Sequence, residues 1–323
     1  MQEILKISDV KVEKGAKKTG FLTVQDDIAG IVKLPVGVIN GSEDGPILSV
    51  TGGMYGTQYA GIDACIQVHN EIDPKKLGGV LICVPVMEMT GFQKGEDQSH
   101  IDNVRINSAF PGDPNGTLTY REAYAVFNEV VKKSKYHLDL RGGDQRELLI
   151  DFMIGSETGK KEFDAENESL AKVLGVKYYT MTPDSKGSLV SEACRLGVHS
   201  IVLLSYKGLS TYEKEDVDKC KKGIYNLLKH LEMIDGKPDM PYVPKRLEFQ
   251  MHRITAKQGG LLYLNVKYGD VVSKGTKLGE IRNIWGEILQ DLTAPIDGII
   301  HAVFPRHIKE PGELILTMRR ILG

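Results

Sequence analysis

Short apolar runs and amphipathic stretches alternate along the chain up to about residue 245. Six runs are nearly continuous in apolar residues, which indicates strands buried on both faces of a sheet. They cover Ile31–Ile39, Ile47–Val50, Val80–Val86, His137–Leu140, Tyr178–Met181 and Ser200–Ser205. Apolar residues recur at helical spacing over Ala60–Glu71, Tyr120–Lys133, Glu166–Leu174, Ser188–Leu196 and Lys214–Leu231. This alternation predicts an α/β fold with a mostly parallel or mixed sheet between layers of helices.

The segment Met89–Thr117 breaks this pattern. It is polar, rich in Gly, Asp and Asn, and shows no helix or strand period. Because a loop of this length inside a compact domain is usually functional, we expect it to contribute to a site.

A change of pattern near residue 245 predicts two domains. Pro238–Pro244 contains three prolines and is typical of a linker. Beyond it, Phe249–Met318 shows only short alternating runs separated by turn residues, which predicts a small all-β domain. We therefore expect an α/β domain over residues 1–245 and a barrel-like β domain over 246–323. The second part resembles a biotinyl/lipoyl-type barrel, but Glu287 stands near the place of the acceptor lysine, so we expect a structural role.

Composition and charge exclude several classes of protein. Among the 323 residues, 41% are hydrophobic and 26% are charged, and the net charge is -2, so nothing favours binding to nucleic acid or to a membrane surface. The first residues carry charges where a signal peptide would be apolar, and no run of 18 apolar residues exists. The four scattered cysteines form no C-x-x-C pair and fit buried free thiols. We expect a cytoplasmic protein.

Two strand ends carry candidate chemistry. The glycine-rich turn in Ser49–Ile62 follows an apolar run and opens a helix, and it presents Tyr55 and Gln58. The run that contains His137 ends in Arg141, followed by two glycines. His137, Asp139 and Arg141 alternate, so they share one face of their strand. We expect a site at this edge of the sheet.

Five blocks are spread over nearly the whole chain: LPVGVINGSEDGPILSVTGG, DNVRINSAFPG, HLDLRGGD, SLVSEACRLGVHSIVLLSY and APIDGIIHAVFPRHIKEPGELIL. Taken together, in this order and at this spacing, they resemble the succinylglutamate desuccinylase/aspartoacylase family, whose fold is that of the zinc carboxypeptidases. The resemblance implies an α/β domain, a small β domain after it, and hydrolysis of a C–N amide bond with one zinc ion.

The residues of that zinc chemistry are replaced in this chain. The family's H-G-x-E places a histidine and a glutamate where this sequence has Tyr55 and Gln58, and its third ligand, a histidine, falls on Arg141. The general base falls on Ser205, or on Leu204 if the register slips by one. A guanidinium has no lone pair for a metal and would repel a dication. We therefore expect no metal and no other cofactor, and a mildly electropositive cleft suited to a small anion.

The family's substrate loop is partly kept. Its substrate-gripping arginine falls on Ser108, its second asparagine is retained as Asn107, and its first asparagine has become Arg105. We expect Arg105, Asn107, Ser108, Gln58 and Asp139 to bind substrate. Arg105 as a solvated surface residue is the competing interpretation.

The catalytic candidates are Tyr55, Arg141 and Ser205, and each has a structural alternative. Tyr55 is either a hydrogen-bond donor or a side chain that fills vacated space. Arg141 either binds a ligand or forms an ion pair with Asp139 or Asp144. Ser205 has no adjacent base in the sequence.

Three functions follow from these residues. The first is a remodelled, metal-free site that binds a small carboxylate or acyl-amino-acid-like anion, with or without catalysis. The second is a metal-dependent hydrolase of N-acyl amino acids whose ligands come from His100, Asp102, Asp139 or Asp144. The third is a non-catalytic ligand sensor or partner subunit. The substrate, the presence of catalysis and the oligomeric state, with a homo-oligomer as one option, stay open.

Overall fold

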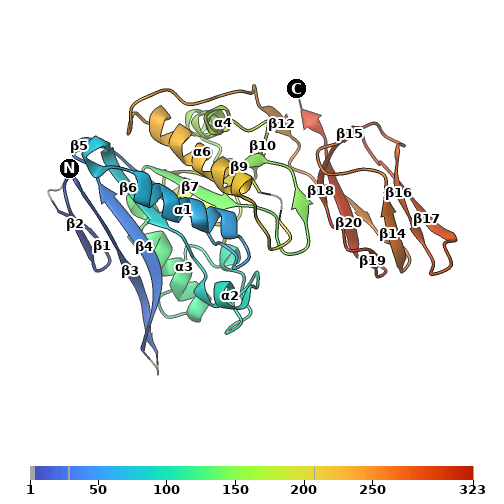
Figure 1. The fold of residues 1–323 in the computed structure, drawn as a ribbon, viewed down its shortest axis with the longest axis horizontal. Helices are drawn as coiled ribbons and strands as arrows, with labels where there is room; N and C mark the ends of the chain where they lie inside the picture. The colour runs from blue at the N-terminus through green and yellow to red at the C-terminus, as the bar shows by residue number, and fades with distance from the viewer. Residues whose placement is uncertain (1–3, 28–29, 207, 323) are drawn as a thin grey trace.

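A large mixed sheet forms the centre of the α/β part of the molecule (Figure 1). The computed structural model describes residues 4–27, 30–206 and 208–322. The sheet has the strand order β21-β12-β10-β9-β11-β7-β5-β6-β4-β3. In that order the strands span Ile321–Leu322, Lys245–Leu247, Tyr178–Thr182, Phe152–Ser156, His199–Leu204, Tyr136–Arg141, Glu43–Thr51, Gly78–Val84, Gly30–Asn40 and Ala16–Asp27. The central strands β11, β7, β5 and β6 run parallel, and β9, β4 and β3 join them through antiparallel pairs.

All six strands expected from the apolar runs are present, with ends that differ by a few residues. The sequence pattern missed β3, β9 and β12, and also the hairpin of β1 (Ile4–Ile7) and β2 (Val10–Glu13). Strand β3 lies at the edge of the sheet and carries several charged and polar residues, so it lacks the continuous apolar run of a central strand.

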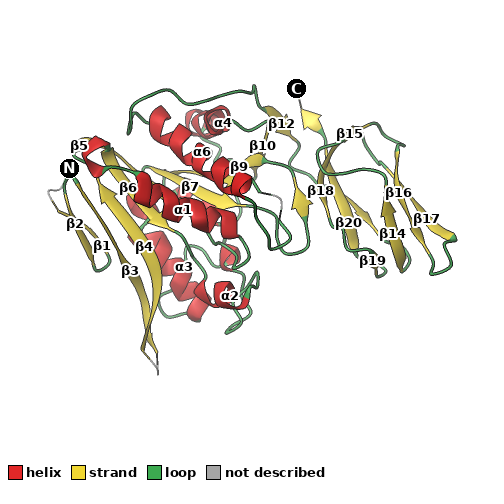
Figure 2. Cartoon of the chain, in the orientation of Figure 1, coloured by secondary structure: helices red, strands yellow, loops and turns green. Residues whose placement is uncertain are grey.

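Helices cover both faces of the sheet (Figure 2). The five expected helices are confirmed as α1 (Tyr59–Glu71), α3 (Leu118–Glu129, then a 3-10 turn at Val131–Lys133), α4 (Lys161–Leu174), α5 (Leu189–Arg195) and α6 (Lys214–His230). One apolar core contains buried residues of α1, α4 and α6, and a second contains those of α3 and α5. The fold class is therefore α/β, as the alternation predicted.

The register of β7 and β11 fixes which side chains face which layer. His137, Asp139 and Arg141 pair with Ser200, Val202 and Leu204, so these six share one face, toward α5. The intervening residues Leu138, Leu140, Ile201 and Leu203 lie in the core beneath α1, α4 and α6. Alternate residues of β7 and β11 therefore face different helix layers, α5 on one side of the sheet and α1, α4 and α6 on the other.

The expected long loop at Met89–Thr117 is not without structure. It contains α2 (Met89–Lys94) and a 3-10 turn at Ile106–Ser108. The carboxylate of Glu88 caps α2 by accepting hydrogen bonds from the backbone N–H groups of Thr90 and Gly91. A helix of six residues is too short to show a period, which explains why the pattern missed it.

Two small sheets form the C-terminal part, and no helix lies there within the described residues. One has β13 (His252–Thr255), β20 (Leu314–Arg319), β18 (Gly298–Val303) and β15 (Val271–Val272), and the other has β17 (Ile288–Thr293), β16 (Lys277–Arg282), β14 (Gly260–Leu264) and β19 (Ile308–Lys309). Strand β8 (Leu148–Leu149) pairs with β18, and β21 returns to pair with β12 of the main sheet. Strand pairs thus cross the boundary expected at residue 245. In the part of the chain that the structure describes, no helix is long and apolar enough to cross a membrane.

Candidate functional site

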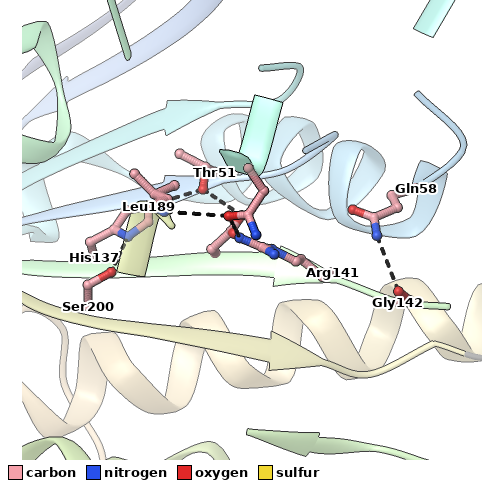
Figure 3. Close-up of polar contacts among 9 residues, drawn as sticks. Thr51, Gln58, His137, Arg141, Gly142, Leu189 and Ser200 are labelled. Atoms are coloured by element: carbon pink, nitrogen blue, oxygen red, sulfur yellow. Dashed lines mark hydrogen bonds and ion pairs between the residues drawn. The ribbon is translucent and has the colours of Figure 1, made fainter. Parts of the chain in front are cut away.

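Three segments meet where β5 and β7 end (Figure 3). Thr51 ends β5, Gln58 lies directly before α1, and Arg141 ends β7. The turn between Thr51 and Gln58 passes close to α2: a Cβ atom on Gly56 would lie 2.2 Å from the backbone carbon of Gly91. Only glycine fits there, so the backbone of this turn is held close to α2.

Arg141 is held from two sides. Its Nε donates to Oδ2 of Asp139 at 2.5 Å, and its Nη2 donates to Oδ1 of Asn107 at 2.9 Å. The backbone N–H of Leu189, at the start of α5, also points to Oδ1 of Asn107 at 3.4 Å. The side chain of Arg141 is 11% exposed and that of Asp139 is fully buried. The ion pair with Asp139, one of the two partners that the sequence offered, is therefore present, and Asn107 orients the guanidinium.

A buried hydrogen-bond chain supports Asp139. Thr51 Oγ1 donates to Oδ1 of Asp139 at 2.8 Å and lies 3.1 Å from Nε2 of His137. Nδ1 of His137 lies 2.8 Å from Oγ of Ser200. Burial lowers the pKa of His137 to about 4, so the imidazole is neutral near pH 7. These contacts fix the Asp139 carboxylate toward Arg141.

The Gln58 side chain is fully buried, and only one of its two polar atoms has a hydrogen-bond partner among the described residues. Its Nε2 donates to the carbonyl oxygen of Gly142 at 3.2 Å. Its Oε1 has no hydrogen-bond partner within the described residues. A buried amide oxygen without a donor costs about 1–3 kcal/mol, so this atom is a candidate acceptor for a bound group.

Tyr55 and Arg105 stack beside this network. The guanidinium carbon of Arg105 lies 4.3 Å from the centre of the Tyr55 ring, and Nη2 of Arg105 pairs with Oδ2 of Asp144 at 2.7 Å. Burial raises the pKa of Tyr55, while Arg141 and Arg105 oppose that shift. The phenol therefore keeps its proton near neutral pH and is a hydrogen-bond donor.

Carboxylates that the sequence did not single out surround Arg105. Asp97 accepts a hydrogen bond from the Thr57 hydroxyl, and Glu147 accepts one from the backbone N–H of Asp144. Burial, with a smaller contribution from Asp144, raises the pKa of Glu147 to about 7. The structure does not give the site the excess of positive charge that we expected. Asp139 and Asp144 pair with the two guanidinium groups, and further acidic side chains lie close by. No periodic signal marks these loop residues.

The side chains of two other predicted residues, Ser205 and Ser108, make no hydrogen bond with the side chains of Arg141, Asp139 or Asn107 within the described residues. The register puts Leu204 on the face of Arg141 and turns Ser205 to the opposite one, where its hydroxyl lies 3.1 Å from Sγ of Cys220 on α6. Ser108 is exposed, and its hydroxyl donates to the backbone oxygen of Arg105. The backbone N–H of Ser205 donates to the backbone oxygen of Arg141, but the two side chains lie on opposite faces of the sheet.

The alternative metal ligands are not brought together either. Asp102 accepts hydrogen bonds from the Thr117 and Thr119 hydroxyls and from the Thr119 backbone N–H. The exposed His100 lies 3.2 Å from the backbone oxygen of Thr90. Over residues 4–27, 30–206 and 208–322, no group of three or more His, Cys, Asp and Glu side chains could hold a metal ion.

The residues at the resembled ligand positions do not fit zinc. Tyr55 is a protonated phenol, Gln58 is a neutral amide, and the Arg141 guanidinium offers only N–H donors. Zinc in proteins is bound by imidazole, thiolate and carboxylate groups, and none of these stands at the three positions.

Known proteins are similar to this chain over nearly its whole length. The family model of the succinylglutamate desuccinylase/aspartoacylase catalytic domain matches residues 44–231. An N-alpha-acetyl-L-2,4-diaminobutyric acid deacetylase from Halomonas elongata is 27% identical over 324 residues, which cover 97% of this chain and 94% of that protein.

Solved structures share the fold. A succinylglutamate desuccinylase from Silicibacter sp. superposes with a TM-score of 0.88 at 20% identity, over 97% of this chain and 98% of that one. The product-bound ectoine utilization protein EutE from Ruegeria pomeroyi gives 0.88 at 20% identity, over 98% and 100%. Because the family model covers more than half of this chain, the chain belongs to the succinylglutamate desuccinylase/aspartoacylase family.

Proposed function

We propose that this chain binds a small N-acylated amino acid, or a related carboxylate, over Tyr55, Gln58 and Arg141, and that it does so without zinc. The observation that carries the proposal is the fixed guanidinium of Arg141. It stands where the family places a metal ligand, and Asp139 and Asn107 hold it in one orientation.

The hydrogen-bond donors and acceptors of the site that have no partner match such a ligand. A guanidinium has five N–H donors, and only two of those of Arg141 have partners among the described residues. The remaining donors suit a carboxylate or an acyl oxygen, and they would supply to that oxygen the positive charge that a metal supplies in the family. The unpartnered Oε1 of Gln58 suits the N–H of an amide.

The carboxylates near Arg105 favour a ligand that also carries a positive charge. Asp97, Asp144 and Glu147 outnumber that guanidinium locally, so a zwitterion is balanced better than a simple anion. The Halomonas elongata relative is, by name, a deacetylase of N-alpha-acetyl-L-2,4-diaminobutyric acid, which has a free amine. We propose a ligand of this class for the present chain.

Calorimetric titration of chelator-treated protein with N-alpha-acetyl-L-2,4-diaminobutyrate tests the proposal. The double variant Asp139→Asn/Arg141→Gln replaces the ion pair with a neutral pair and so avoids an unpaired buried charge. We expect it to bind at least about tenfold more weakly, since each tenfold corresponds to about 1.4 kcal/mol. The matched control is Arg195→Gln, which breaks surface ion pairs with Asp184 and Glu192.

Two results would contradict the proposal. One is binding that the double variant leaves unchanged, and the other is binding that appears only after zinc is added. An assay for released acetate on the same samples separates an enzyme from a sensor, because turnover consumes the ligand whereas binding alone only stabilises the fold.

A further inference from the structure

A cavity of about 430 Å³ lies at the junction of the α/β part and the C-terminal sheets. Its walls come from the segment between β8 and β9, the end of α4 with the start of β10, the end of β11, helix α6, the segment before β12, and the turn between β14 and β15. Ser205 lines it, and Ser205 faces away from Arg141. The cavity is therefore separate from the site proposed above, on the other side of the main sheet.

Positive charge dominates the lining. Lys177, Lys219 and Lys222 contribute three ammonium groups, against the single carboxylate of Asp151. Lys219 pairs with Asp151 at 3.1 Å and Lys222 with Asp239 at 2.6 Å. Within the described ranges, no carboxylate pairs with Lys177. One cation of the lining is thus left for a ligand.

Aromatic rings complete the lining. Tyr178, Tyr242 and Tyr268 all border the cavity, and the ammonium of Lys177 lies 4.9 Å from the centre of the Tyr242 ring. In the described part of the chain, none of the three tyrosine hydroxyls has a hydrogen-bond partner. The same wall therefore offers flat apolar surfaces and polar groups that have no partner in the protein.

We propose that this cavity is a second binding site, which takes a small organic anion that carries a planar ring. The ammonium of Lys177 pairs with the anionic group, the tyrosine rings contact the ring of the ligand, and their hydroxyls bond its polar edge. The volume lies within the usual range for small-molecule sites, which favour domain junctions. Because the walls come from both parts of the chain, a bound ligand ties the two parts together.

Fluorescence titration with 8-anilinonaphthalene-1-sulfonate, a planar aromatic sulfonate, tests the proposal on the full chain. Lys177→Glu reverses the charge of the free cation, and Tyr242→Ala removes a ring that is 41% exposed, so neither change disturbs the buried core. We expect Lys177→Glu to weaken binding at least about tenfold and Tyr242→Ala at least about threefold. Lys76→Glu, an exposed lysine elsewhere, is the charge-matched control.

The competing location for this dye is an apolar cavity of about 440 Å³ between α1 and strands β3 and β4, where Ile66 is 45% exposed. Ile66→Asp is therefore included and is expected to leave the main titration unchanged. The proposal is overturned if Ile66→Asp abolishes binding while Lys177→Glu does not, or if no saturable binding occurs. Lys177→Glu should also leave the binding of N-alpha-acetyl-L-2,4-diaminobutyrate unchanged, which separates this proposal from the preceding one.

Discussion

At Arg141, the end of strand β7 carries a buried guanidinium that forms an ion pair with Asp139. Desolvating an ion pair is expensive, and the pair persists only where further hydrogen bonds satisfy it. Asp139 accepts from Thr51 as well as from Arg141, and Arg141 also reaches Asn107. The charge is thereby fixed in place instead of being mobile, which is the condition for electrostatic stabilisation of a bound oxygen.

Glu147 gives the site a measurable pH dependence. Its pKa in the folded chain is about 7, against an ordinary value of 4.5, because the carboxyl is buried beside Asp144. Between those two values the folded chain keeps a proton that the unfolded chain has released, so this group lowers stability as pH rises through the window. Asp97 and Arg105 face the same carboxyl and act in opposite directions.

Glu147→Gln should therefore stabilise the protein above pH 7, by about 1–3 kcal/mol, with a difference that shrinks toward pH 4.5. Urea unfolding of both proteins at several pH values measures this. Glu43→Gln, an exposed glutamate, serves as the control. A stability difference that does not change with pH would show that Glu147 has an ordinary pKa.

The sequence predicted the positions of the site residues better than their contacts. Gln58 lies directly before α1 and Arg141 ends β7, close to the end of β5, and Arg141 donates a hydrogen bond to Asn107. The contacts of Asp97 and Glu147 could not be predicted, because they depend on how irregular loops fold back on each other. The direction of Ser205 required the strand register, which a slip of one residue reverses.

Among the elements, helix α3 depends on a residue from the preceding loop. Thr117 at its N-terminus makes no capping hydrogen bond with its own side chain, and Asp102 accepts from the backbone N–H of Thr119 instead. Although burial opposes it, hydrogen bonds from Thr117 and Thr119 lower the pKa of Asp102 to about 2. Capping of α3 therefore gives Asp102 a structural role in the polar loop.

Asp102→Ala should lower stability by about 1–2 kcal/mol, the usual loss for a helix cap, and should leave ligand binding at Arg141 unchanged. Thermal unfolding and the titration with N-alpha-acetyl-L-2,4-diaminobutyrate measure the two effects. Because the folded pKa lies below the ordinary value, the contribution of Asp102 is present above about pH 4 and is lost toward pH 2. Loss of binding in a variant of unchanged stability would contradict this role.

For the whole molecule, hydrophobic periodicity sufficed for the central layers. Strands such as β6, in which every residue is buried, leave an apolar run that only a covered sheet explains. Periodicity did not suffice at the edges of the sheet. Strand β3 is rich in polar residues, and β21 has only two residues and lies far along the chain from its partner β12. Such pairs arise from tertiary contacts and leave little local pattern.

We propose that this chain keeps the family's fold and has the fixed guanidinium of Arg141 in place of the family's zinc site. The most direct test is the zinc content of the full chain after incubation with excess zinc and gel filtration, measured by mass spectrometry. We expect less than about 0.1 equivalent of zinc per chain, because Tyr55, Gln58 and Arg141 offer no imidazole, thiolate or carboxylate. One equivalent of retained zinc would contradict it.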